Sequence, residues 1–90
     1  MPTVRVRIYA GLRIRLGWKE RVIELDENCR SINCLLIYLP EVKNELERYM
    51  VKGYDPIILV NGRNIFLCRK LDEELSDGDE VDIFPPSAGG

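Results

Sequence analysis

The sequence contains no histidine, and this absence removes a large part of enzyme chemistry. Without an imidazole there is no Ser-His or Cys-His nucleophile pair and no histidine acid or base. Cysteine is also scarce, because the chain has only Cys29, Cys34 and Cys68, and they include no C-x-x-C pair. With no histidine to complete a tetrahedral site, we expect no metal site in this chain.

The three cysteines are best interpreted as reduced side chains. Free cysteine is usually buried and packs as a small hydrophobic residue, and an odd number of thiols suits a reducing compartment. We therefore expect the three side chains in or near the core. A bridge between Cys29 and Cys34 stays open on the sequence alone.

Long hydrophobic runs are missing as well. The longest uninterrupted apolar stretch is residues 34–39, far short of the roughly 20 residues that a membrane-spanning helix needs. The amino-terminal residues alternate between apolar and polar and lack the apolar block of a signal peptide. These patterns predict a cytoplasmic protein that does not act at a membrane.

The charge is nearly balanced overall but unevenly distributed. Lys and Arg number 13 and Asp and Glu 15, so the net charge of −2 implies no general attraction to nucleic acid. Residues 1–21 carry six basic side chains and one acidic one, whereas residues 71–90 carry seven acidic ones and no basic one. Two explanations fit: the chain ends neutralise each other as neighbouring strands, or the acidic segment forms a face for a basic partner.

Five short segments have the composition of β-strands. They are residues 4–10, 21–25, 57–60, 63–67 and 80–84. Asn61-Gly62 predicts a hairpin between the third and fourth, because both positions of such a turn need positive φ. Residues 11–20 are predicted to form a loop in which Leu12 and Leu16 point inward.

Between the second and third strands the apolar spacing becomes that of a helix. One helical face carries the apolar residues Ile32, Leu35, Leu36 and Leu39. Ser31 is suited to cap this helix, and Pro40 ends it but can begin a second, weaker one. The order of elements predicts an α+β domain, a five-stranded sheet packed on one main helix.

After the last strand the chain reads Pro85-Pro86-Ser87-Ala88-Gly89-Gly90. Two prolines favour an extended conformation, and six residues at about 3.3 Å each reach roughly 20 Å. Such a tail can enter a narrow channel in another protein, where a side chain on either glycine would collide. We therefore divide the chain into a domain, residues 1–84, and a tail, residues 85–90, with the Gly90 carboxylate as the reacting group.

Residues 75–90 closely resemble the end of the β-grasp sulfur carriers, and among them the small subunits of molybdopterin synthase. Residues 60–62 resemble the mid-chain hairpin of that family, and residues 10–13 resemble its first loop. The resemblance implies a ubiquitin-like β-grasp fold with a mixed sheet, in which the first and last strands are adjacent and parallel.

The resemblance also implies a reaction cycle. An E1-like adenylating enzyme would activate the Gly90 carboxylate with Mg-ATP, and a sulfurtransferase would convert it to a thiocarboxylate. The tail would then insert into the large subunit of molybdopterin synthase and donate sulfur to precursor Z (cyclic pyranopterin monophosphate) in molybdenum or tungsten cofactor synthesis. The chain itself would bind no cofactor and would be a sulfur-donor subunit without a complete active site.

The predicted partner-binding residues begin at the end of the last strand. If Val81 and Ile83 point to the core, Phe84 points to the opposite face, where an exposed aromatic suits an interface. The alternative is that Phe84 covers the edge of the core. The tail completes the predicted set with Pro85, Pro86, Ser87, Ala88 and Gly89. Weaker candidates for the same patch are Tyr9, Ile57 and Leu59.

Two residues depart from the family pattern, and other functions stay open. Ser87 follows the prolines where relatives often have valine, and Asp82 stands where an apolar residue is common. One alternative is a sulfur carrier for thiamin or tRNA thiolation, and another is a ubiquitin-like modifier joined through Gly90 to lysines of target proteins. An RNA-binding module is disfavoured by the net charge of −2.

Overall fold

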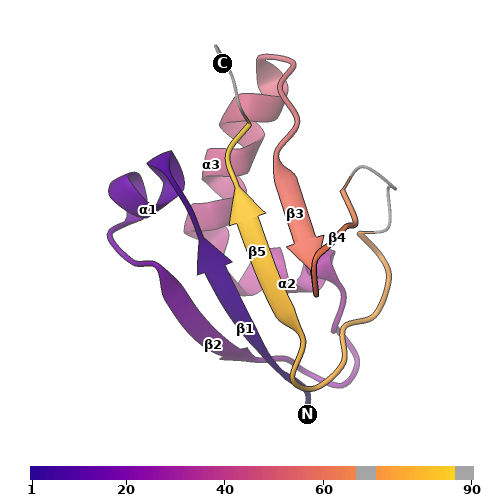
Figure 1. The fold of residues 1–90 in the computed structure, drawn as a ribbon. Helices are drawn as coiled ribbons and strands as arrows, with labels where there is room; N and C mark the ends of the chain where they lie inside the picture. Colours follow the sequence, from indigo (N-terminus) through magenta and orange to yellow (C-terminus); the bar gives the residue numbers. More distant parts are fainter. Residues whose placement is uncertain (67–70, 87–90) are drawn as a thin grey trace.

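The computed structural model describes residues 1–66 and 71–86, in which a five-stranded sheet is covered on one face by helices α2 and α3 (Figure 1). The strand order is β2-β1-β5-β3-β4. The strands are β1 (Thr3–Ile8), β2 (Glu20–Glu24), β3 (Ile57–Val60), β4 (Arg63–Asn64) and β5 (Glu80–Phe84). The helices are α1 (Gly11–Leu16), α2 (Ile32–Tyr38) and α3 (Pro40–Val51). The predicted α+β class is confirmed.

The first and last strands lie side by side and parallel at the centre of the sheet. Val6 pairs with Val81 and Ile8 with Ile83, and all four side chains are fully buried. Strand β2 runs antiparallel to β1, and β3 runs antiparallel to β5, so the sheet is mixed. This is the β-grasp arrangement that the resemblance implies.

Two consecutive helices pack on the buried face of the sheet. The hydroxyl of Ser31 accepts a hydrogen bond from the backbone N–H of Cys34 at 3.2 Å, which confirms the predicted cap of α2. Pro40 then opens α3, a position where its missing N–H costs no hydrogen bond. Helix α3 is longer than α2, so α3 is a full part of the helical layer. No helix in the described ranges has the length and apolar composition to cross a membrane.

The prediction of a loop over residues 11–20 is wrong, because α1 occupies the first six of them. Leu12 is fully buried and Leu16 packs against the core, as the four-residue spacing of a helix allows. Gly17 ends the helix with φ 81°, and its N–H donates to the carbonyl of Arg13. The helix was hard to recognise because Ala10, at its start, offers no capping side chain.

The predicted hairpin after β3 is confirmed, but its return strand is shorter than expected. Asn61 and Gly62 have φ values of 50° and 86°, as the turn requires. The return strand β4 covers only two residues, after which the N–H of Ile65 still donates to the carbonyl of Ile58 at 3.0 Å. Leu67, the predicted end of this strand, lies outside the described residues.

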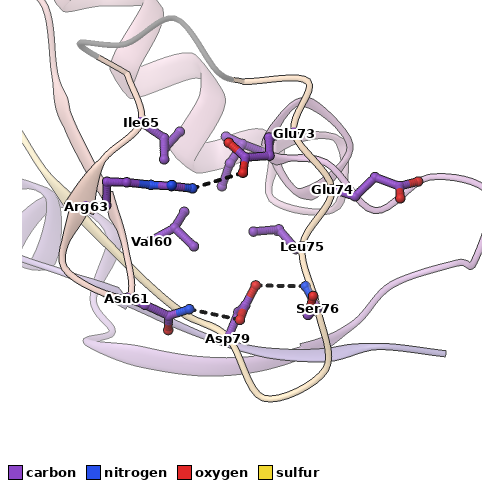
Figure 2. A pocket seen from close by; sticks show the side chains of 10 residues that line it. Val60, Asn61, Arg63, Ile65, Glu73, Glu74, Leu75, Ser76 and Asp79 are labelled. Carbon is purple, nitrogen blue, oxygen red and sulfur yellow. Dashed lines mark hydrogen bonds and ion pairs between the residues drawn. The ribbon is translucent and has the colours of Figure 1, made fainter.

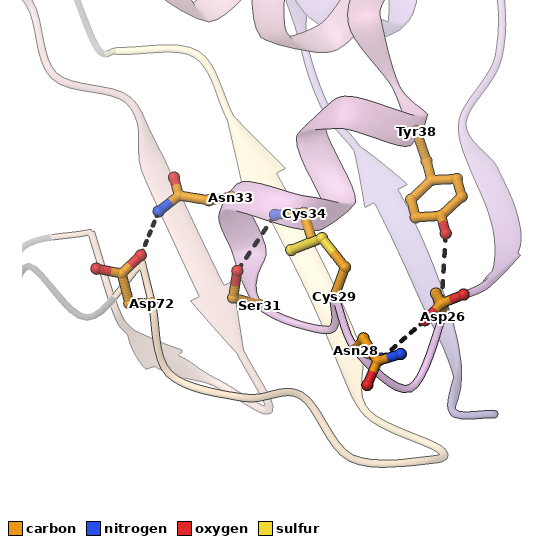
Figure 3. The surroundings of a disulfide bond; sticks show 8 residues. All are labelled: Asp26, Asn28, Cys29, Ser31, Asn33, Cys34, Tyr38 and Asp72. Atoms are coloured by element: carbon orange, nitrogen blue, oxygen red, sulfur yellow. Dashed lines mark hydrogen bonds between the residues drawn. A yellow bond between two sulfur atoms is a disulfide. The ribbon is translucent and has the colours of Figure 1, made fainter.

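Cys29 and Cys34 form a disulfide, which corrects the expectation of reduced thiols (Figure 3). The N–H of Cys29 donates to the carbonyl of Asp26, and the resulting turn positions Cys29. The cap at Ser31 positions Cys34. The two Cα atoms are therefore 5.4 Å apart, within the range that a disulfide spans. Both residues are half-buried rather than part of the core. Cys68 lies outside the described residues.

Candidate functional site

Strand β5 carries the chain to the base of the predicted tail. It lies between β1 and β3 and ends at Phe84, and Pro85 and Pro86 follow as half-buried residues beyond the strand (Figure 1). The predicted residues Ser87, Ala88, Gly89 and Gly90 lie outside the described residues. The described part of the site is therefore the sheet around Phe84.

The ring of Phe84 stacks on the ring of Tyr9, which follows β1. The two ring centres are 4.2 Å apart and the planes differ by 9°. Val81 and Ile83 are fully buried, so alternation along β5 places Phe84 on the sheet face away from the core. This is the predicted side of the sheet. Contact of Phe84 with a partner stays a prediction.

Asp82 links β5 to β1 through two side chains. Its Oδ1 accepts hydrogen bonds from the Tyr9 hydroxyl at 2.9 Å and from Arg7 Nε at 2.8 Å. Burial, followed by the hydrogen bond to Asp82, raises the pKa of Tyr9, and the hydrogen bond to Asp82 raises the pKa of Arg7. Arg7 was missing from the predicted site. The alternation that puts Arg7 and Tyr9 on one strand face was the available signal.

Strand β3 adds two apolar side chains beside these contacts. Ile57 pairs with Phe84 and Leu59 with Asp82, so both project from the same face of the sheet, and both are half-buried. We call the four residues Tyr9, Ile57, Leu59 and Phe84 the open-face patch. Aromatic and aliphatic side chains of this kind are typical of the centre of an interface. The structure thus brings together the residues that the sequence analysis grouped.

The opposite charges of the two chain segments pair across β1 and β5. Arg7 contacts Glu80 at 2.8 Å and Arg5 contacts it at 3.4 Å. This confirms that the segments neutralise each other as neighbouring strands. The other acids pair as Asp72 with Asn33, Glu73 with Arg63, Glu74 with Arg30, Asp77 with the backbone of Thr3, and Asp79 with Asn61. Docking of a basic partner on these acids stays a prediction.

A cavity of about 410 Å³ lies at the other end of the sheet. Figure 2 shows its rim, where Arg63 pairs with Glu73 and Asn61 with Asp79, each at 2.9 Å. Val60 lines this cavity, whereas Ile57, at the opposite end of β3, pairs with Phe84. The cavity is thus separated from the base of the tail by the length of β3, and we assign it no part in the site.

Comparison with known proteins identifies the family of this chain. The ThiS family matches residues 6–90. The chain belongs to the ThiS family. A protein of Archaeoglobus fulgidus named as a sulfur carrier is 34% identical over 73 residues, which cover 76% of this chain and 83% of the relative. This chain is accordingly a sulfur carrier of the ThiS type.

Solved structures show the same fold. The small archaeal modifier protein 1 of Methanosarcina acetivorans has a TM-score of 0.73 and 29% identity, covering 100% of this chain and 98% of its own. A Pyrococcus furiosus protein named as molybdopterin converting factor subunit 1 has a TM-score of 0.64 and 33% identity, covering 96% of this chain and 99% of its own. The ubiquitin-like fold implied by the resemblance is confirmed.

Proposed function

We propose that this chain is the sulfur-donating small subunit of molybdopterin synthase. The observation that carries the proposal is the likeness to the Pyrococcus furiosus protein, at 33% identity over 96% of this chain. The position of the open-face patch supports it. A carrier whose tail reacts inside another protein must be held at the base of that tail, and Phe84 lies directly before Pro85 and Pro86.

Loading of the tail requires activation, because a carboxylate is a poor electrophile. In the proposed cycle, the Gly90 carboxylate attacks the α-phosphorus of ATP on an E1-like adenylating enzyme, and pyrophosphate leaves. A persulfide on a sulfurtransferase then attacks the acyl carbon and displaces AMP. A cellular thiol reduces the resulting disulfide and leaves a thiocarboxylate on Gly90. Mg-ATP belongs to the adenylating enzyme in this scheme.

Delivery of the sulfur takes place at the same residue, Gly90, inside a second protein. Inside the large subunit, the thiocarboxylate sulfur attacks a carbon of precursor Z and displaces an oxygen substituent, which gives a thioester between Gly90 and the pterin. Water then hydrolyses the thioester, so that the sulfur stays on the pterin and Gly90 becomes a carboxylate again. Glycine permits this approach because its Cα carries no side chain. The sequence has no histidine, so acid and base groups for the transfer come from the large subunit in this proposal.

Intact mass spectrometry of the protein purified from its own cells tests the loading step. Replacement of one oxygen of the Gly90 carboxylate by sulfur adds about 16 Da, and a variant that lacks Gly89 and Gly90 is the control. Conversion of precursor Z by the thiocarboxylated chain with the large subunit then tests the acceptor. A chain that never gains sulfur, or that leaves precursor Z unchanged, contradicts the proposal.

A second candidate function is a ubiquitin-like modifier. It is favoured by the likeness to the small archaeal modifier protein 1 of Methanosarcina acetivorans over the whole of this chain. In that case an amine of a target lysine attacks the activated Gly90 and forms an amide. Covalent adducts of higher mass that disappear when Gly89 and Gly90 are deleted distinguish this function. A sulfur carrier for thiamin or tRNA thiolation would show the added sulfur but leave precursor Z unchanged.

A further inference from the structure

Asp82 is held firmly for a carboxylate on an open sheet face. Its side chain is 14% exposed, whereas that of Glu80, two residues earlier on the same face, is 43% exposed. Asp82 Oδ1 accepts the hydrogen bonds from Tyr9 and from Arg7 Nε. Asp82 Oδ2 lies 3.5 Å from Arg7 Nη2. Asp82 therefore has two fixed partners, Arg7 on β1 and Tyr9 directly after it.

Tyr9 carries the effect of Asp82 to the base of the tail. Residues 82 and 84 project from the same face of β5, and Tyr9 contacts both, with its hydroxyl on Asp82 and its ring on Phe84. The guanidinium carbon of Arg13 lies 5.2 Å from the centre of the Tyr9 ring, and Arg13 Nε donates to the carbonyl of Ile8 at 3.1 Å. The Tyr9 side chain is thus fixed by three groups and restricts the Phe84 ring.

We propose that Asp82 is a positioning residue, which acts through Tyr9 to fix the Phe84 ring for the enzyme that activates the tail. The inference rests on the proposed function, because it needs a partner that docks at Phe84. A side chain that is already fixed loses less conformational entropy when a complex forms. Asp82 therefore improves binding of the carrier and takes no part in the chemistry at Gly90.

Pyrophosphate release by the E1-like adenylating enzyme, measured against carrier concentration with saturating Mg-ATP, tests this role. Asp82→Ala removes the acceptor for Tyr9, whereas Asp82→Asn keeps an oxygen at that place. We expect Asp82→Ala to raise the KM for the carrier about tenfold, the order expected for one hydrogen bond to a charged group. The kcat should stay within about twofold, and Asp82→Asn should restore most of the KM.

Two further variants separate positioning from a general effect of charge. Tyr9→Phe keeps the ring and removes the hydroxyl, so we expect the same rise in KM as for Asp82→Ala. The double variant should be no worse than Asp82→Ala alone, because both single variants remove the same hydrogen bond, the one between Tyr9 and Asp82. Glu80→Gln is the matched control, since it removes a carboxylate that pairs with Arg7 without touching Tyr9. Its KM should stay within about twofold of the wild type.

Each outcome decides the inference. A wild-type KM in both Asp82→Ala and Tyr9→Phe, additive effects in the double variant, or an equal rise in Glu80→Gln overturns it. If Asp82→Ala does not fold, Tyr9→Phe compared with Glu80→Gln decides the question. Absence of pyrophosphate release by the wild type refutes the proposed function and the inference together, whereas unaffected variants of an active wild type refute the inference alone.

Discussion

Tyr9 combines an apolar contact and a polar contact in one side chain. Its ring packs on Phe84, while its hydroxyl donates to the carboxylate of Asp82. Loss of the phenol proton would place a phenolate against that carboxylate, so the contact requires the neutral form. Burial and the hydrogen bond to Asp82 raise the pKa of Tyr9 for the same reason.

Because the pKa of Tyr9 is raised, we expect the protein to lose stability in alkaline solution. The phenol pKa of Tyr9 is raised above its ordinary value of 10.0, so above that pH the folded chain holds a proton that the unfolded chain releases. The free energy of unfolding therefore falls as the pH rises toward the raised pKa. Urea unfolding between about pH 8 and pH 11 should show a shallower fall for Tyr9→Phe than for the wild type. Equal slopes in the two proteins would contradict this, and Tyr54→Phe, at an exposed tyrosine, is the control.

At the scale of elements, two neighbouring residues of β3 have different roles, one in the stability of the fold and the other in the proposed binding of a partner. Ile58 is fully buried, whereas Ile57 is half-buried in the open-face patch. We expect Ile58→Ala to cost about 2–4 kcal/mol of unfolding free energy, measured in urea, because it leaves a cavity in the core. Ile57→Ala should cost less than about 1 kcal/mol and weaken binding of the adenylating enzyme roughly tenfold. Similar losses of stability in both variants would show that β3 does not divide the two roles.

We expect that reduction of the disulfide between Cys29 and Cys34 destabilises the connection between β2 and α2. Cys29 and Cys34 are five positions apart, and a closed loop of this size contributes about 2 kcal/mol in the chain-entropy estimate. A reducing agent should therefore lower the melting temperature of the wild type by roughly 10 °C. The variant with serine in place of both cysteines should melt at the lower temperature under either condition. A reductant effect that persists in that variant would have another origin.

The helix starts and the turn that could be predicted are those marked by a residue with a characteristic local effect on the backbone. Ser31, Pro40 and Asn61-Gly62 each act through their own backbone or side chain, and the structure places each as predicted. Helix α1 lacks a capping side chain at Ala10, so its start gave no such signal. The bridge between Cys29 and Cys34 depends on two turns that meet in space, and sequence spacing alone cannot choose between bridged and free thiols.

At the scale of the whole molecule, the parallel pair of β1 and β5 explains both the charge pattern and the position of the patch. The basic first strand and the acidic last strand lie side by side, so Arg5 and Arg7 meet Glu80 and Asp82. The same pairing brings Tyr9 to Phe84, although they are far apart in the chain. The sequence predicted this neighbourhood from charge and resemblance, but the hydrogen bond between Tyr9 and Asp82 depends on side-chain geometry that no pattern encodes.

The proposed function predicts that the end of the tail is sensitive to a change that leaves the domain intact. One alanine added after Gly90 moves the carboxylate beyond its reacting position and puts a Cβ where glycine is required. Because the fold is held by the buried residues of β1, β5 and the helices, the melting temperature should not change. Mass spectrometry after incubation with the adenylating enzyme, the sulfurtransferase and Mg-ATP should detect no thiocarboxylate. Full loading of the extended chain would show that Gly90 is not the reacting residue, whereas a lowered melting temperature would show that the tail also supports the domain.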